Sequence, residues 1–140
     1  MKKVRIMPEN HWDWSVPVSF SQGWKVGNLI FVGGQVAFDE NRNIIGEGDI
    51  EAQTRAVFEN IKKVLNEVGA DMKDIVKFNT YYVNDAEGEE VNEFWRKMTK
   101  VRLEYLPEPG PAGTAVRVEG FATDGLLIEV EAIAVVTDEG

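Results

Sequence analysis

The sequence predicts an α+β fold in which two helices pack on one face of a sheet. Four segments are rich in β-branched and aromatic residues, which suit the pleated surface of a strand. Two segments with helical apolar spacing lie among them, so the expected order is strand, helix, strand, helix, strand, strand. Helices placed among long strands in this way favour a single helical layer on the sheet.

The first expected strand covers residues 29–38 and contains Gly33 and Gly34. Two adjacent glycines weaken a strand, so they predict a bulge or a point where a ligand or another backbone comes close. The following residues, 39–43, predict a turn, because Asp and Asn side chains bond to their own backbone.

The first helix is expected over residues 50–68, where Asp49 can cap its start and Gly69 can supply the left-handed stop. Its apolar stripe consists of Val57, Ile61, Val64, Leu65 and Val68. The second strand is expected over residues 75–83, with Val76, Phe78, Thr80 and Tyr82 on one face.

A turn over residues 84–88 leads into the second helix, expected over residues 89–105 and ended by Pro107. Two strands follow, over residues 114–119 and 126–136. The sheet face opposite the helices would carry Tyr81, Ile133 and Val135, which are too apolar for a water-facing surface. Self-association through this face is therefore predicted.

Length and composition favour one globular domain spanning residues 1–140. Hydrophobic residues make up 44% of the chain and the net charge is −9, which disfavours binding to nucleic acid or to anionic membranes. No apolar run reaches the ~18 residues of a membrane span, and the start of the chain lacks a signal-peptide pattern. We expect a soluble, cytoplasmic protein with a small-molecule or protein partner.

The residues disfavour several kinds of site. With no cysteine and a single histidine, His11, a zinc site built from His and Cys ligands is impossible. The 39–50 segment begins like a calcium loop but has Ile44 and Ile50 where glycine and glutamate belong, so a plain turn is favoured. No nucleotide-binding glycine motif occurs, and we expect no cofactor.

His11 has no GxSxG partner, so a surface or capping role is favoured over a catalytic triad. Trp12 and Trp14 beside it could close a pocket, or could equally cover the edge of the core. Glu129 and Glu131 project from one face of the last strand. If that face is partly buried, desolvation and like-charge repulsion would raise one pKa and provide a proton-transfer group; if it faces water, both are ordinary surface carboxylates.

Four segments together resemble the RidA/YjgF family. They are Val26–Gln35, Asp49–Arg55 with Asn60–Leu65, Gly69–Lys77 and Ile128–Val135, and the resemblance covers about residues 18–136. It implies a chorismate-mutase-like α+β fold that forms a homotrimer with ligand clefts between subunits. Well-known members hydrolyse reactive enamines and imines to a carbonyl compound and ammonia without a cofactor.

The resemblance also implies site residues. Glu129 corresponds to the strand glutamate that handles protons, and Asn92, Gly34 and Gln35 are retained cleft residues. Three other positions depart from the pattern: Gly113 stands where active members carry the carboxylate-binding arginine, Phe20 replaces a tyrosine, and Gly33 replaces a serine. The chain thus resembles the branch that lacks the arginine.

Arg117 lies four residues beyond Gly113, about 13 Å along a strand, too far to place its guanidinium at the same point without a bulge. An inter-subunit or surface ion pair is favoured for it, with a substrate-binding role as the alternative. Trp24, like Trp12 and Trp14, could add an aromatic wall and a surface for a cation.

Two hypotheses follow. In the first, the protein is an enamine or imine deaminase of altered substrate range that uses Glu129 for proton transfer and Asn92 for positioning. In the second, it is a trimeric small-molecule binding or regulatory protein that has lost catalysis along with the arginine and the two hydroxyl groups. Hydrolysis of a particular catabolic intermediate is a remoter third possibility.

Overall fold

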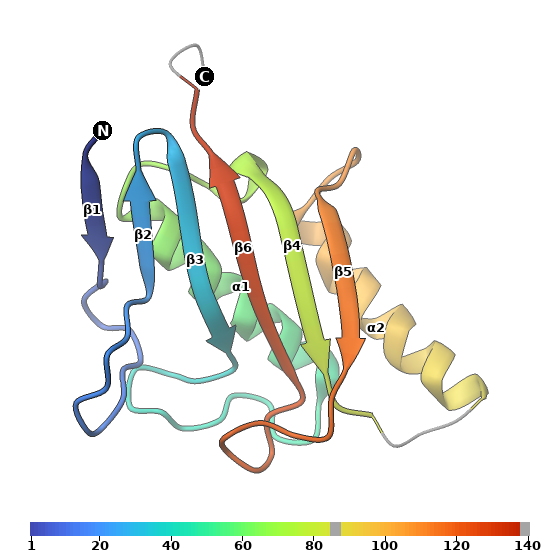
Figure 1. The fold of residues 1–140 in the computed structure, drawn as a ribbon. Coiled ribbons are helices and arrows are strands. Elements are labelled where there is room, and N and C mark those ends of the chain that lie inside the picture. The colour runs from blue at the N-terminus through green and yellow to red at the C-terminus, as the bar shows by residue number, and fades with distance from the viewer. Residues whose placement is uncertain (85–87, 138–140) are drawn as a thin grey trace.

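The computed structural model describes residues 1–84 and 88–137, so the turn expected over residues 84–88 lies largely outside the described part. Within these residues, six strands form one mixed sheet with the order β1-β2-β3-β6-β4-β5, and both helices pack against one face of it (Figure 1). The predicted α+β class with one helical layer is confirmed. The elements are β1 (Lys3–Ile6), β2 (Gly23–Val26), β3 (Leu29–Val36), α1 (Ile50–Asn66), the 3-10 turn η1 (Met72–Asp74), β4 (Ile75–Tyr82), α2 (Glu89–Tyr105), β5 (Ala112–Arg117) and β6 (Ile128–Val135).

Helix α1 begins and ends as the residue types predict. The Asp49 carboxylate accepts a hydrogen bond from the Ala52 amide at 3.1 Å, and Gly69 adopts a φ of +77° beyond the end of the helix. The helix ends at Asn66, two residues before the expected Val68. Val57, Ile61, Val64 and Leu65 of its apolar stripe are fully buried, and α1 packs against β3 and β6, whereas Val68 lies beyond the helix and is partly buried.

The strands β1 and β2 were not predicted. Each has only four residues, two of them apolar and alternating, and a run this short is too weak a pattern to identify a strand. Backbone pairing with neighbouring strands identifies them as strands, because β1 pairs with β2 and β2 pairs with β3, both antiparallel. The last two strands also begin elsewhere than expected, β5 at Ala112 and β6 at Ile128.

The predicted irregularity at Gly33 and Gly34 is confirmed. The pairing of β3 with β6 shifts register between Val32 and Gln35, as a β-bulge requires. A similar shift between Ile75 and Lys77 in β4 leaves Val76 48% exposed. The prediction that Val76 shares the buried face of Phe78 is therefore wrong, because the irregularity breaks the two-residue period.

The face of the sheet opposite the helices carries a row of large apolar side chains. Trp24, Phe31 and Ile133 are consecutive cross-strand neighbours on β2, β3 and β6, and the first two are 37% and 41% exposed. Tyr81 and Val135 lie in this layer as predicted, each only half-buried. Figure 1 shows that both helices cover the opposite face of the sheet. No described helix is long and apolar enough to cross a membrane.

Candidate functional site

Glu129 on β6 lines a pocket of about 160 Å³ whose walls are mainly aromatic. The pocket is small, since drug-sized ligands occupy roughly 300–1,000 Å³. Glu129 is its one ionisable lining residue, and Thr123 adds a hydroxyl group. The aromatic walls are Trp12, Trp14, Phe20, Phe38 and Phe121.

The Glu129 carboxyl group is half-buried, and burial raises its pKa above the ordinary value of 4.5, with a further rise from the neighbouring charge of Glu131. Glu131 has different surroundings, because it accepts hydrogen bonds from the Tyr81 hydroxyl at 2.9 Å and from the Asn79 amide at 3.2 Å. No described residue forms a hydrogen bond or ion pair with the Glu129 carboxyl group. Of the two carboxyl groups on this strand face, Glu129 is therefore the one free to exchange a proton.

The bulge in β3 provides the space for Glu129. A β-carbon built on Gly34 would lie 2.7 Å from Glu129 Oε2, closer than any real side chain could approach. Gly33, the other bulge residue, has different neighbours, and its β-carbon would lie 3.0 Å from the carbonyl oxygen of Ser21. The two glycines thus serve different purposes: one makes room for a carboxylate and the other for backbone.

Three of the five aromatic wall residues, Trp12, Trp14 and Phe20, come from the segment between β1 and β2. Trp12 makes an edge-to-face contact with Trp14, with ring centroids 5.5 Å apart and planes at 85°. Trp12 also contacts Phe20 at 5.7 Å and Phe38 at 5.8 Å. Both alternatives raised for the tryptophan segment therefore apply to Trp12, which is buried in the core and lines the pocket as well.

Gln35 anchors this segment to the sheet. Its side-chain oxygen accepts hydrogen bonds from the Trp12 indole at 3.0 Å and from His11 Nε2 at 2.8 Å, and its amide donates to Gln22 at 2.8 Å. Gln35 is wholly buried and does not line the pocket. Its place in the structure is that of a support for the aromatic wall.

The favoured surface or capping role of His11 is wrong, because the side chain is buried beside Gln35. His11 lies beside Trp12, with ring centroids 6.0 Å apart, and bonds to Gln35, a burial that the sequence around His11 did not reveal. Burial is the largest cause of a pKa below the ordinary 6.5, and the charge of Lys63 lowers this pKa further. The Nδ1 atom is buried with no hydrogen-bond partner.

The structure brings Phe20, Gly34 and Glu129 together at the pocket, whereas Asn92, Gly113 and Arg117 do not line it. Asn92 is exposed on α2, in the helical layer. Gly113 and Arg117 lie on the exposed edge strand β5, opposite Phe78 and Tyr82. A β-carbon on Gly113 would lie 2.6 Å from the Phe78 carbonyl oxygen, so this position is closely packed despite its exposure.

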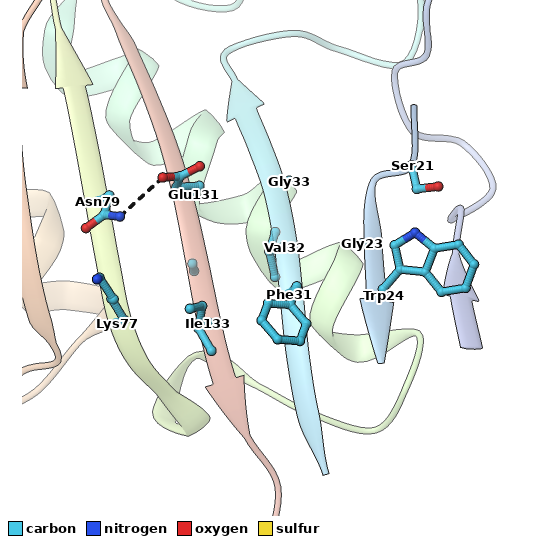
Figure 2. A pocket seen from close by; sticks show the side chains of 11 residues that line it. Ser21, Gly23, Trp24, Phe31, Val32, Gly33, Lys77, Asn79, Glu131 and Ile133 are labelled. Carbon is cyan, nitrogen blue, oxygen red and sulfur yellow. Dashed lines mark hydrogen bonds between the residues drawn. The ribbon is translucent and has the colours of Figure 1, made fainter. Parts of the chain in front are cut away.

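Gly33 and Trp24 line a different hollow, on the open sheet face (Figure 2). This hollow has a volume of about 320 Å³ and combines apolar side chains with Lys77, Asn79 and Glu131. Figure 2 shows the row of Trp24, Phe31 and Ile133 across adjacent strands, with the bond between Asn79 and Glu131 beside it. Trp24 is thus separate from the pocket that Trp12 and Trp14 line.

Several pocket residues were not predicted, among them Phe38, Phe121 and Thr123. Phe121 and Thr123 lie in the loop between β5 and β6, which showed no sequence motif. Their proximity to the 12–20 segment depends on the order of the strands in the sheet. An aromatic residue in a loop of small and polar residues was the only signal available in the sequence.

The chain is thus an α+β protein with a six-stranded sheet, one helical layer and a pocket of aromatic side chains beside one carboxyl group. The family model described as "Endoribonuclease L-PSP" matches residues 15–136 of the chain. A RutC family protein of Pyrococcus abyssi is 47% identical over 115 residues, which are 82% of this chain and 84% of that protein. The 3-aminoacrylate deaminase RutC of Acinetobacter baylyi is 34% identical over 96% of this chain and 98% of its own.

Solved structures agree with these relatives. The RidA protein of the Antarctic bacterium Psychrobacter sp. PAMC 21119 superposes with a TM-score of 0.80 at 29% identity, over 95% of this chain and 99% of its own. The chain therefore belongs to the RidA/YjgF family, also described as the Endoribonuclease L-PSP family.

Proposed function

We propose that the protein hydrolyses the C=N bond of a small imine, or of an enamine in its imine form, to a carbonyl compound and ammonia. The observation that carries this proposal is the half-buried Glu129 carboxyl group with its raised pKa, placed in a pocket without another ionisable residue. The deaminase named among its relatives, RutC of Acinetobacter baylyi, supports the reaction class.

In the proposed reaction, water adds to the imine carbon while Glu129 accepts one of its protons and passes it to the nitrogen. The resulting carbinolamine breaks its C–N bond, and the bonding electron pair leaves with the nitrogen. Glu129 takes up the hydroxyl proton and transfers it to the departing nitrogen as the carbonyl forms, so imine plus water gives carbonyl compound plus ammonia. Because the steps require only proton transfers, one carboxyl group and one water molecule suffice.

The proposed assembly is a homotrimer with the pocket completed at a subunit boundary. The exposed row of Trp24 and Phe31 on the open sheet face supports this, because apolar surface of this kind is typical of an interface. Asn92 is exposed in the helical layer, so a positioning role for Asn92 requires that a neighbouring subunit supply it. The same holds for a substrate-binding role of Arg117 on the edge strand β5.

The proposed substrate range differs from that of arginine-bearing deaminases. Gly113 has no side chain to hold a substrate carboxylate, and Phe20 and Gly33 provide no hydroxyl groups. The Thr123 hydroxyl group and the backbone amides near Gly34 are the polar groups of this chain proposed to position substrate and water.

The family description mentions an endoribonuclease, but the residues favour C=N chemistry over phosphodiester cleavage. The described pocket contains no cationic side chain to bind a phosphate. The net charge of −9 also opposes association with RNA.

A second function, non-catalytic binding of a small molecule, is favoured by the absence of the arginine at Gly113. One experiment separates the two. Purified protein is mixed with freshly generated imines, and ammonia release is compared with that of Glu129→Gln and of a surface control, Glu67→Gln. Acceleration that is lost only in Glu129→Gln supports the deaminase, whereas saturable thermal stabilisation by a metabolite without turnover supports the binding protein.

A further inference from the structure

The charge balance of the pocket beside Glu129 indicates which substrates it can accept. Among the described residues of this chain, its lining contains one negative charge and no positive one. A substrate bearing a carboxylate would therefore place its own negative charge near Glu129 without compensation, at a cost that rises as the site is desolvated.

The aromatic walls of the pocket also favour a positively charged substrate over a carboxylate. The face of an aromatic ring carries partial negative charge, and a cation within about 6 Å of the ring centroid is attracted by about 0.5–2 kcal/mol. Trp12 and Trp14 stand at 85° to each other, so they form two sides of a corner rather than one flat wall. Trp12 is 3% exposed and its indole N–H is bonded to Gln35, so the half-buried Trp14 is the indole that offers ring surface to a ligand.

Glu129 provides the counter-charge at this corner. Gly34 leaves the space in which the carboxylate lies, and no described side chain neutralises it. A cation bound between the Trp14 ring and this carboxylate would restore the charge balance that burial of Glu129 disturbs. Aromatic walls with a single carboxylate are a typical arrangement for recognising an organic ammonium group.

We propose that the pocket beside Glu129 selects a small organic monocation without a carboxylate, namely a protonated iminium ion with a short apolar substituent. This inference deepens the proposed function and names its substrate class. For such a substrate the reaction balances as iminium plus water giving ketone plus ammonium, with one positive charge on each side. The volume of about 160 Å³ limits the substituent to a small alkyl chain or ring.

Binding tests the inference without requiring turnover. Three probes share one ring and differ in charge: cyclopentylammonium, cyclopentanol and cyclopentanecarboxylate. Affinities are measured by tryptophan fluorescence and checked by NMR titration at pH 7.5. We expect the ammonium ion to bind about tenfold more tightly than the alcohol and the carboxylate to bind more weakly than either.

Two variants test whether the preference for the ammonium ion arises in the pocket beside Glu129. Glu129→Gln should bring the affinity for the ammonium ion to that of the alcohol, and Trp14→Leu should weaken ammonium binding several-fold. The control Glu67→Gln removes one exposed carboxylate from α1's C-terminal end and should change neither affinity. Tighter binding of the carboxylate, or an ammonium preference that survives Glu129→Gln, would overturn the inference.

A turnover measurement keeps this inference separate from the proposed function. The iminium ion of cyclopentanone is compared with a 2-iminoacid of similar size, with ammonia as the product measured. Faster hydrolysis of the simple iminium supports both claims. Hydrolysis of the 2-iminoacid alone would contradict the charge selection while leaving deamination intact, and ammonium binding without any turnover would contradict deamination while leaving the charge selection intact.

Discussion

The carboxylate of Glu129 lies directly over the backbone of Gly34, where a β-carbon would come within 2.7 Å of its Oε2 atom. The bulge in β3 thus creates the space in which the one ionisable group of the pocket is held. The clash would involve the far end of a flexible side chain, which can rotate away at little cost.

Gly34→Ala is therefore expected to displace Glu129 while leaving the fold stable. Imine hydrolysis should fall at least tenfold, and the free energy of unfolding should change by less than about 1 kcal/mol. Gly33→Ala is the matched comparison, because its β-carbon would meet the Ser21 carbonyl oxygen, which cannot rotate away. We expect Gly33→Ala to lower stability more than Gly34→Ala in urea denaturation, and the reverse order would contradict this assignment of the two glycines.

Gln35→Leu should loosen the wall of the pocket. The substitution leaves His11, Trp12 and Gln22 without the partners that Gln35 gives them, and each unsatisfied buried group costs about 1–3 kcal/mol. We expect a loss of about 2–5 kcal/mol in denaturant unfolding. Tryptophan emission should also shift to the red as Trp12 is exposed, and unchanged emission would show that the segment is held in another way.

Burial of His11 predicts a stability that depends on pH. Because the pKa of His11 is lower in the folded protein than its ordinary 6.5, the unfolded chain binds a proton first as the pH falls. The stability provided by neutral His11 is complete above pH 6.5 and is lost as the pH falls toward the pKa of the folded state. Asp13 opposes this shift and Lys63 promotes it.

The measurement is urea denaturation of the natural protein and of His11→Gln between pH 7.5 and pH 5. Subtracting the two curves removes the opposite contribution of Glu129, whose raised pKa stabilises the protein at low pH. The difference in the free energy of unfolding should shrink or change sign as the pH falls. A difference that is constant across this range would contradict the burial of a neutral His11.

Gly113→Ala should destabilise the edge of the sheet. The added β-carbon would lie 2.6 Å from the Phe78 carbonyl oxygen, so β5 has to move away from β4. We expect a loss of about 1–3 kcal/mol, the usual cost of overpacking. Thermal unfolding measures it, with Ala115→Ser on the same strand as the control. An unchanged melting temperature would contradict this expectation. It would also show that a side chain at position 113 does not disturb the sheet, which must be known before a Gly113→Arg variant is used to restore a carboxylate-binding arginine.

The residues that were predicted correctly are those that act through their immediate neighbours in the sequence. The Asp49 cap, the Gly69 stop and the Gly33–Gly34 irregularity follow from backbone requirements that each residue meets locally. The apolar side chains of the open sheet face could also be predicted from the sequence, because strand alternation places Ile133 and Val135 on the same face.

What the sequence could not give depends on contacts between distant segments. β1 and β2 become strands by pairing at the edge of the sheet, and at four residues each their own alternation is too short to identify them. His11 has polar neighbours in the sequence, yet it is buried through its bond to Gln35, 24 residues away. The family resemblance identified Glu129 and Phe20 as site residues. Phe121 could not be identified in this way, because only the arrangement of the strands brings it to the pocket.

The central claim is that Glu129 handles the protons of C=N hydrolysis, and its direct test is the pH dependence of ammonia release from a small iminium substrate. Because a proton-accepting group normally contributes about 10²–10⁴-fold, Glu129→Gln should lower kcat/KM by at least 100-fold. In the natural protein, activity should fall at acid pH with a midpoint above the ordinary glutamate pKa of 4.5, since burial raises the pKa of Glu129. Equal rates for the natural protein and Glu129→Gln, with no acid limb in either, would contradict the account.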